Sequence, residues 1–541
     1  MRFRSPLVIA GAVAIALAGA ARADDASDLK AKFEELQKQM ESLKSQLDQV
    51  NAQLQKQKEE QAKAAPAGGA VPFLKKKEGD PVTFITPGGE ITLYGQLDVS
   101  LDDTTKGIAG MKDSNTPPQS PVGRVGWMLG LSTNFTYVGV RGFQKVIPDL
   151  NFVYQLETQV DLTATAGTVN TNSNNDTIVK GGLTSRNSFI GFANKDWGAF
   201  KVGKTDAPYK TSTARMDPFN GMIGTYSIIL GNTGGDNRVE FGTRLDKAVW
   251  YESPKWEGVS FNALWSPSQN RSTDNSNIAS GESSCAGGNA PGSGALAPAC
   301  NDGSWGTAYS ANVAYEQGPI YGTIAYERHS DVNRSSDQPT AAFPQGDPRD
   351  IGDEWAVKVG VQYKFPTETT VSALWEKTRR SLPSFLEIQN ERTRDNATWL
   401  AVTQKLTDKD NVSVGWAHAG GTPGDPGQHN TPGAVVDPVT GVFGNPHPDN
   451  QANMFTAALK HNLNKSTLVY FDWALTLNHP FAHYDLGAGG RGLTTDCHDA
   501  SQLAAFDPTA NGGAGGVSGN GPRCWAGGRL QGFSVGMNYK F

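Results

Sequence analysis

The chain contains 541 residues, 62 of them glycine, and it has a mean hydropathy of −0.43 and a formal net charge of −6. Beyond the N-terminus it has no apolar run close to the roughly 18 residues that a transmembrane helix requires, so a helical membrane protein is excluded. The mild charge gives no reason to expect nucleic acid as a partner. A membrane-spanning β-barrel is not excluded, because the lumen and loops of a barrel dilute its apolar signal.

The first 23 residues have the pattern of a secretory signal peptide. Arg2 and Arg4 precede an apolar stretch over 7–20, and Ala21-Arg22-Ala23 supplies a small-x-small cleavage site. A retained membrane anchor is the competing interpretation, but the alanine-rich core is short and the cleavage site favours removal. We expect an exported chain that begins at Asp24.

Residues 24–60 carry a heptad repeat. Its apolar positions lie alternately four and three residues apart, at Leu29, Phe33, Leu36, Met40, Leu43, Leu47, Val50 and Leu54. The flanking positions contain no carboxylate, so charge pairing does not select the partner, and the number of helices stays open. The repeat predicts a coiled coil of roughly 45 Å over 28–58. Prolines, glycines and lysines then predict a linker over 61–88.

Apolar and polar residues alternate strictly in several later segments. The clearest are 91–101, 150–162 and the last nine residues, 533–541. Side chains of a strand alternate between two faces, so each segment predicts a strand with one apolar face. Alternation alone does not show whether that face points inward, as in a soluble barrel or sandwich, or outward against lipid.

The connections between these segments alternate between short and long. Seven compact turn signals occur at 147–149, 194–196, 253–255, 317–319, 365–367, 407–409 and 463–465. Eight long polar stretches lie near 102–126, 163–183, 206–243, 267–304, 331–351, 380–393, 421–450 and 478–528. Short turns at one end and long loops at the other are typical of bacterial outer-membrane barrels. We therefore predict an all-β fold, a sixteen-stranded antiparallel transmembrane β-barrel over 89–541, with an N-terminal α-helical coiled coil.

The four cysteines fall in two of the long loops. Cys285 and Cys300 share one loop, and Cys497 and Cys524 share another. Four cysteines allow three pairings. In an oxidising compartment we expect the two local disulfides, because each closes its own loop.

Residues 89–541 resemble the Gram-negative general porins, which are trimeric sixteen-stranded diffusion channels. The resemblance rests on the order and spacing of Leu93-Tyr94-Gly95, Val138-Gly139-Val140-Arg141-Gly142, Phe152–Glu157, Arg186–Gly191, Trp197–Lys204, Arg244–Pro254 and the terminal Phe541. It implies a homotrimer in the Gram-negative outer membrane, in contact with outer-membrane lipid and lipopolysaccharide, that passes ions and small hydrophilic solutes. It also implies that the third external loop, here 205–243, folds inward and narrows the pore. The coiled coil is not part of the family pattern.

The resemblance implies pore-lining residues only in part. Lys204 matches a basic wall position of the family, and Arg186 and Arg141 are further basic candidates. Other family positions are occupied by different residues, namely Gln96, Tyr137 and Glu252. The inner loop contains the acids Asp206, Asp217, Asp236 and Glu240 and the bases Lys210, Arg215 and Arg238. Any of these residues is equally compatible with a solvated loop position, and the near balance of charge predicts no strong ion selectivity.

Two enzyme motifs match as strings but not in context. Residues 198–205 satisfy the phosphate-loop pattern, yet 199–202 is predicted as a strand and no helix is predicted after it. Residues 532–536 match the nucleophile-elbow string, yet the chain ends before a following helix. His479 and His483 have helical metal-ligand spacing but lie in a proline-containing loop, where solvation is the simpler interpretation. No enzyme activity, cofactor or metal is predicted.

The predicted function is passive diffusion through a water-filled lumen, with the coiled coil in the periplasm. One alternative makes the barrel an anchor whose coil tethers the outer membrane to a periplasmic partner, such as the cell wall. Another makes it a channel specific for one class of solute. A tether needs no conductance, and a specific channel shows saturable block by its solute.

Overall fold

The computed structural model describes residues 74–75, 80–105, 127–160, 162–163, 186–231, 241–267, 306–333, 351–381, 392–421, 435–436, 443–444, 451–479, 484, 486–487, 506–507, 516–517 and 529–541. The predicted signal peptide, the predicted coiled coil and all four cysteines lie outside these residues. The description below concerns the unit from Leu74 to Phe541.

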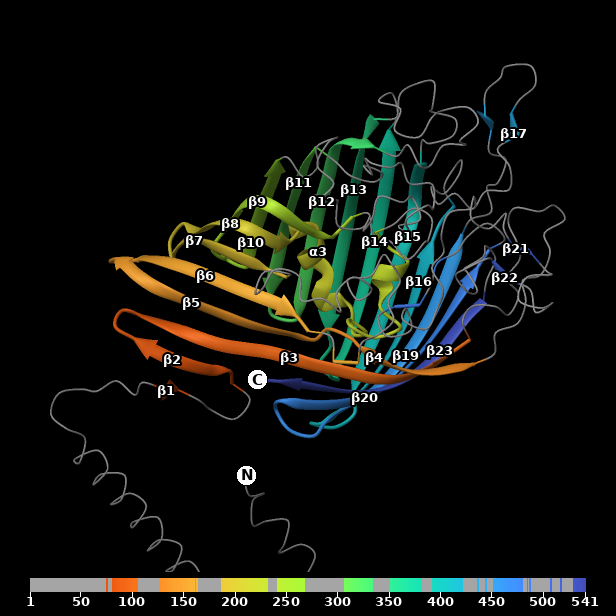
Figure 1. Ribbon diagram of the computed structural model, residues 1–541, viewed down its shortest axis with the longest axis horizontal. Coiled ribbons are helices and arrows are strands. Elements are labelled where there is room, and N and C mark those ends of the chain that lie inside the picture. The colour runs from red at the N-terminus through yellow and green to blue at the C-terminus, as the bar shows by residue number, and fades with distance from the viewer. Residues whose placement is uncertain are drawn as a thin grey trace, which may run out of the picture. The chain divides into compact units, whose positions relative to one another are not determined.

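The described strands form one closed antiparallel barrel (Figure 1). Its strands are β3 (Gly89–Thr104), β4 (Met128–Thr133), β5 (Tyr137–Ile147), β6 (Leu150–Gln159), β7 (Ser188–Asn194), β8 (Gly198–Asp206), β9 (Arg244–Glu252), β10 (Val259–Pro267), β11 (Thr307–Gln317), β12 (Ile320–Asn333), β13 (Ile351–Lys364), β14 (Thr369–Ser381), β15 (Arg392–Lys405), β16 (Asp410–Ala419), β19 (Ala452–Asn462), β20 (Thr467–Asn478) and β23 (Arg529–Lys540). Both β4 and β5 pair with β3, one after the other, so they fill a single place in the wall. The barrel therefore has sixteen strand positions, as predicted.

The last strand closes the barrel against the first. Strand β23 pairs with β3 from Gly532↔Thr104 to Lys540↔Gln96. The backbone of Phe541 then exchanges two hydrogen bonds with that of Gly95, at 3.0 and 3.1 Å. This closure leaves no free strand edge at the seam. A sheet in lipid must have no free edge, because unpaired backbone groups find no water there.

The short connections occur where the turn signals predicted them, for example between β5 and β6 and between β19 and β20. They lie at one end of the barrel, which we call the turn end, and the strand ends that the long connections join lie at the other, the loop end. Two small hairpins lie within the long connections, formed by β17 (Val435–Val436), β18 (Phe443–Gly444), β21 (Phe506–Asp507) and β22 (Gly516–Val517).

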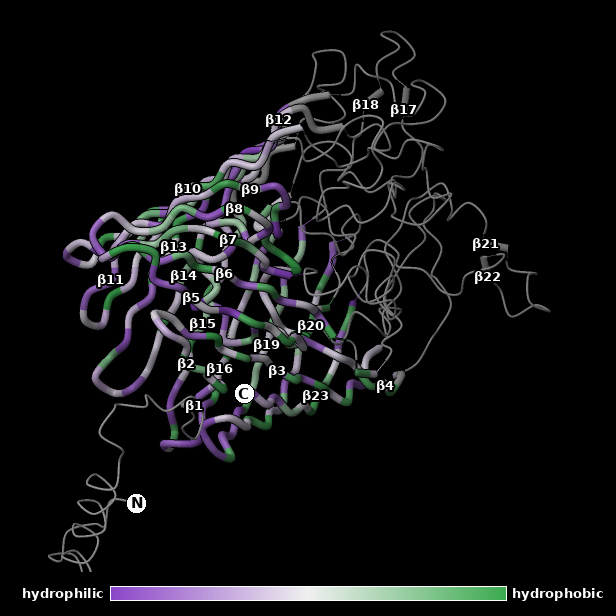
Figure 2. The backbone as a smooth tube through the Cα atoms, turned by 60° about the vertical axis from the view of Figure 1, so that its left-hand side comes forward, coloured by the Kyte–Doolittle hydropathy of each residue, from purple (hydrophilic) through white to green (hydrophobic). Residues whose placement is uncertain are grey.

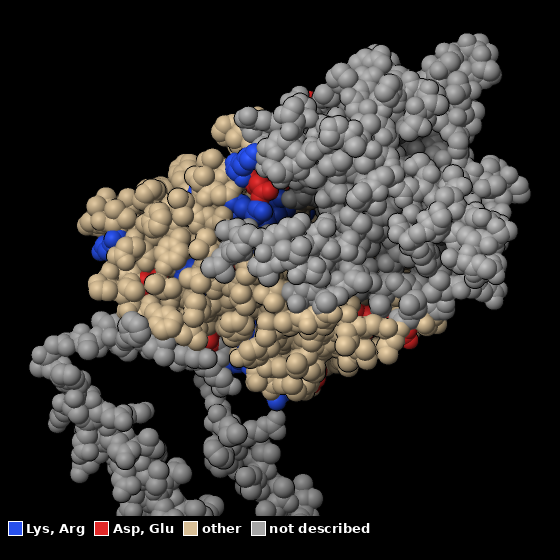
Figure 3. Space-filling model, in the orientation of Figure 1, with Lys and Arg blue, Asp and Glu red and all other residues tan. Residues whose placement is uncertain are grey.

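The apolar faces of the strands point outward. In β23, Val535 is 58% exposed, whereas its neighbour Ser534 is 2% exposed. Ile324 and Thr323 of β12 show the same contrast, with 59% and 4%. Figure 2 shows this alternation of hydropathy along the strands, and the described surface facing the viewer in Figure 3 carries few charged atoms. A soluble barrel would have the opposite arrangement, so these faces indicate a surface that meets lipid.

Exposed aromatic residues mark the borders of this outward apolar band. Tyr309 and Tyr315 of β11 are six residues apart, as are Phe533 and Tyr539 of β23, and all four are exposed. Six residues of strand span about 20 Å. The spacing is consistent with the apolar band of an outer-membrane barrel, which is flanked by aromatic girdles.

The predicted linker over 61–88 needs a correction at its end. Val82–Thr86 forms strand β2, which pairs with Gly89–Leu93 of β3, and Leu74–Lys75 forms β1 against β2. The sequence Val-Thr-Phe-Ile-Thr favours a strand, and Gly88, with a φ of 77°, makes the tight turn that follows. Strand β2 thus continues the edge of β3 beyond the point where β23 ends.

The helices in the described residues are all short. They are α3 (Pro208–Thr213) and the 3-10 turns η1 (Ala214–Met216) and η2 (Tyr226–Ile228). None has the length and apolar character needed to span a membrane. Helix α3 was not predicted, although Pro208 at its first position is a common helix start. The phosphate-loop string lies within β8 and the nucleophile-elbow string within β23, so both are strands rather than the loops that these motifs require.

Candidate functional site: the barrel lumen and its inner loop

After β8 the chain crosses the interior of the barrel. We call 207–231, with the return segment 241–243, the inner loop. Its backbone bonds to three distant strands: Tyr209 N–H donates to Ser310 Oγ of β11, Trp399 Nε1–H of β15 donates to the Met216 carbonyl, and Gly224 N–H donates to Asp472 Oδ2 of β20. These bonds measure 2.9, 3.0 and 3.1 Å. Because β15 and β20 lie across the barrel from β8, the segment must pass through the lumen, where Figure 1 shows α3.

Apolar packing holds the inner loop against one part of the wall. The inward positions of β15, β16 and β19 include six buried alanines, Ala397, Ala401, Ala417, Ala419, Ala452 and Ala458. These small side chains leave room for Phe219, Met222 and Tyr226 of the loop, which are buried against them. Trp399, fully buried, packs edge-on to Phe219 at 5.9 Å and against Tyr226 at 5.4 Å. The sequence analysis missed this contact, whose only local signal is alanine at inward strand positions.

Carboxylates fasten the two ends of the loop. Glu376 of β14 accepts hydrogen bonds from Tyr209 Oη and from Gly231 N–H, both at 2.8 Å. Glu327 of β12 accepts one from Gly242 N–H at 2.9 Å. Each of these buried carboxylates thereby accepts at least one hydrogen bond from the loop, which fixes the path of the loop through the lumen.

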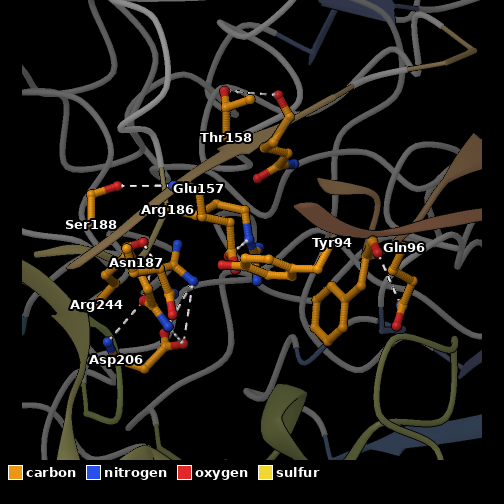
Figure 4. Close-up of polar contacts among 12 residues, drawn as sticks. Tyr94, Gln96, Glu157, Thr158, Arg186, Asn187, Ser188, Asp206 and Arg244 are labelled. Carbon is orange, nitrogen blue, oxygen red and sulfur yellow. Dashed lines mark hydrogen bonds and ion pairs between the residues drawn. The ribbon is translucent and has the colours of Figure 1, made fainter. Parts of the chain in front are cut away.

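A polar strip lines the wall formed by β3, β5 and β6 (Figure 4). Glu157 accepts from Tyr94 Oη at 3.0 Å and pairs with Arg186 Nε at 2.5 Å. The guanidinium of Arg186 lies 4.7 Å from the ring centre of Tyr137, and that of Arg141 lies 4.7 Å from the ring centre of Tyr94. Cation–π contacts and the ion pair hold these long side chains in place without removing their donors from the lumen.

Three of the predicted pore residues, Tyr137, Arg141 and Arg186, therefore belong to this strip, and Gln96 lies beside it. Its Nε2 donates to the Phe135 carbonyl at 2.9 Å. Near the strip, where the inner loop begins, Asp206 is 2.8 Å from Lys210 Nζ and 3.1 Å from Arg244 Nη2 (Figure 4 shows Asp206 with Arg244). One carboxylate is thus shared by two cations.

The same arrangement recurs at the turn end. Glu316 of β11 lies 2.7 Å from both Arg215 Nη1 and Lys255 Nζ. Glu252, predicted as a pore residue, pairs with Lys201 Nζ at 2.7 Å on the inward face of neighbouring strands.

Lys204 lies near the end of β8, where the inner loop begins. Its Nζ is 2.8 Å from Asp246. Strand β8 pairs regularly with β7, but its pairing with β9 shifts register between Gly203 and Thr205, so simple alternation does not carry through Lys204. Lys204 stays a predicted pore residue. Asp236, Arg238 and Glu240 lie outside the described residues.

Asp217 lies at the turn that leads to the tip of the inner loop and is partly buried. Its carboxylate accepts from Thr225 Oγ1 at 2.6 Å and from Phe219 N–H at 2.9 Å. Burial raises the pKa of Asp217 to about 6, because desolvation outweighs these two bonds.

Among the described residues, no group of His, Cys, Asp or Glu has the arrangement of a metal site.

A family model for Gram-negative porins matches residues 10–479. The chain belongs to this family. The porin has no match among curated proteins. Its fold is similar to that of an anion-selective porin from Comamonas acidovorans, at 16% identity and a TM-score of 0.53, over 84% of this chain and 100% of that one. Further similar structures are OmpT of Vibrio cholerae and a Salmonella typhi OmpF complex with daunomycin. Each has 13% identity and a TM-score of 0.46, over 85% of this porin and 100% of the other chain.

The porin is thus an outer-membrane channel for passive diffusion of ions and small hydrophilic solutes, in agreement with the sequence-based prediction. Its family and its fold are those of channels rather than enzymes.

Proposed function

We propose that the inner loop is the constriction of this porin, and that solutes pass between it and the polar strip of β3, β5 and β6. The observation that carries the proposal is the path of 207–231, which leaves β8 and packs against the inward face of β15, β16 and β19. A loop anchored this way occupies one part of the lumen and leaves the remainder open to water. Size exclusion then follows from the gap beside the loop.

Two clusters of lumenal charges favour a weak preference for anions. Asp206 and Glu316 are each shared by two cations, so both clusters carry a local surplus of positive charge. In a lumen filled with water these charges are screened over about 10 Å at moderate salt, which keeps the preference weak. The solved anion-selective porin with a similar fold is consistent with this sign.

The constriction is tested by replacing 218–230 with a short Gly-Ser linker in the full-length protein. We expect a severalfold rise in single-channel conductance in planar bilayers, because the loop no longer narrows the lumen. Barrel folding is checked by heat-modifiable migration in gels. An unchanged conductance in a folded barrel would place the constriction elsewhere.

We further propose a homotrimer in contact with outer-membrane lipid and lipopolysaccharide, with 24–60 as a periplasmic coiled coil joined through 61–81. The heptad pattern and the porin family support this assembly. A tether to the cell wall and a channel specific for one solute are the alternatives, and neither is favoured by the family match.

A further inference from the structure

Arg215 and Lys255 lie on either side of one carboxylate at the turn end of the lumen. Arg215 belongs to the inner loop and Lys255 to the connection between β9 and β10. Glu316 accepts from Arg215 Nη1 through Oε1 and from Lys255 Nζ through Oε2, both at 2.7 Å. The three side chains are each exposed by 41–48%, so they meet water as well as one another.

Arg215 is held in position by contacts on its other sides. Its guanidinium lies 4.3 Å from the ring centre of Tyr321, and its Nε donates to Gln362 Oε1 at 3.2 Å. The amide of Gln362 in turn donates to the Arg215 carbonyl. The next residue, Met216, is fully buried and bonded to Trp399. The side chain therefore loses little further conformational freedom when it binds a ligand, which is the usual cost of using a long cation.

The charges of Arg215, Lys255 and Glu316 do not cancel, so the group can attract an anion. Two cations face one carboxylate, so the group of three has a net charge of one positive unit. Arginine can match two oxygens of a carboxylate or phosphate with a planar pair of N–H donors, whereas a halide offers a single acceptor atom. Lys255 adds a second charge that a multiply charged anion can reach.

We propose that Arg215 and Lys255 form a binding site for small oxyanions, carboxylates and phosphates, on the turn-end side of the inner loop. The proposal rests on the proposed open lumen, because solutes must reach this end. The site would hold an oxyanion briefly as it leaves the constriction, and so raise the flux of such solutes at low concentration.

Inorganic phosphate is the probe for this site. In planar bilayers containing the full-length protein and KCl, added phosphate should reduce the chloride current in a saturable way. Arg215→Lys keeps the charge but loses the paired donors, so half-maximal block should require about tenfold more phosphate, as expected for the loss of a charge-assisted hydrogen bond.

Lys255→Gln should weaken the block in the same direction. The matched control is Lys195→Gln, since Lys195 also lies in a short connection and has one carboxylate partner, Asp149, at 3.6 Å. Phosphate should block the chloride current of the Lys195→Gln control to the same extent as that of the wild type. A wild-type channel that conducts without saturable phosphate block, or equal block in Arg215→Lys and the wild type, would overturn the site. Absence of any conductance would instead contradict the proposed function.

Discussion

At the scale of single residues, Asp217 connects loop burial to pH. Its ordinary pKa is 3.8, and burial raises it to about 6 in the folded loop. Between these two values the buried carboxyl holds a proton that an exposed one would release. The packed position of Asp217 is therefore stabilised as the pH falls through about 6, and this stabilisation is lost as the pH rises.

Acidification should also change ion selectivity. Moving from about pH 7.5 to about pH 5 neutralises Asp217, so the reversal potential under a salt gradient should shift toward anions. In Asp217→Asn, which has no charge to lose, this part of the shift should vanish. A variant that retained the whole wild-type shift would show that another group is responsible.

At the scale of elements, the inner loop depends on Trp399 of β15. This side chain is fully buried, packs against two aromatic rings of the loop and donates to its backbone. The alanines around it are too small to hold the loop alone. Apolar packing thus anchors the loop against the wall, in addition to the hydrogen bonds to carboxylates at its two ends.

Trp399→Ala should loosen the loop while the barrel still folds. Loss of a buried tryptophan removes about 3–5 kcal/mol of packing, and here the loss falls on the loop's contact with the wall. We expect higher and noisier single-channel conductance. Trp375→Ala is the control, because Trp375 is 40% exposed on the neighbouring strand and points outward. Equal conductance changes in the two variants would contradict the assignment.

At the scale of the whole molecule, two regions compete to drive assembly: the barrel and the predicted coiled coil. The flanks of the predicted heptads offer no opposite charges to select a partner. We therefore expect barrel contacts to contribute most of the association free energy.

Replacing both Leu36 and Leu43 with Asp tests this ranking. Two charges in the apolar seam should unfold the coil, so helical signal in circular dichroism should fall. The barrel trimer should survive native electrophoresis. If these substitutions yield monomers, the coil drives assembly and the ranking is reversed.

The sequence by itself determined the strands, their number and the family. Period-two alternation, as in 150–162, and turn signals such as Ile147-Pro148-Asp149 are local properties of the chain, and β6 and the short turns form where they predict. Sixteen strand positions follow from counting them. The membrane class followed from the distribution of loop lengths, and the outward apolar faces confirm it.

Only the tertiary structure decided where the inner loop goes and which charges meet. Met216 and Trp399 are 183 residues apart, and Arg215 and Glu316 are 101 apart, so no local pattern links them. The ion pair of Lys204 with Asp246 crosses the register shift between β8 and β9, which no local pattern indicates. Such contacts depend on closure of the barrel, which brings distant inward faces together around one lumen, and closure is a property of all the strands at once.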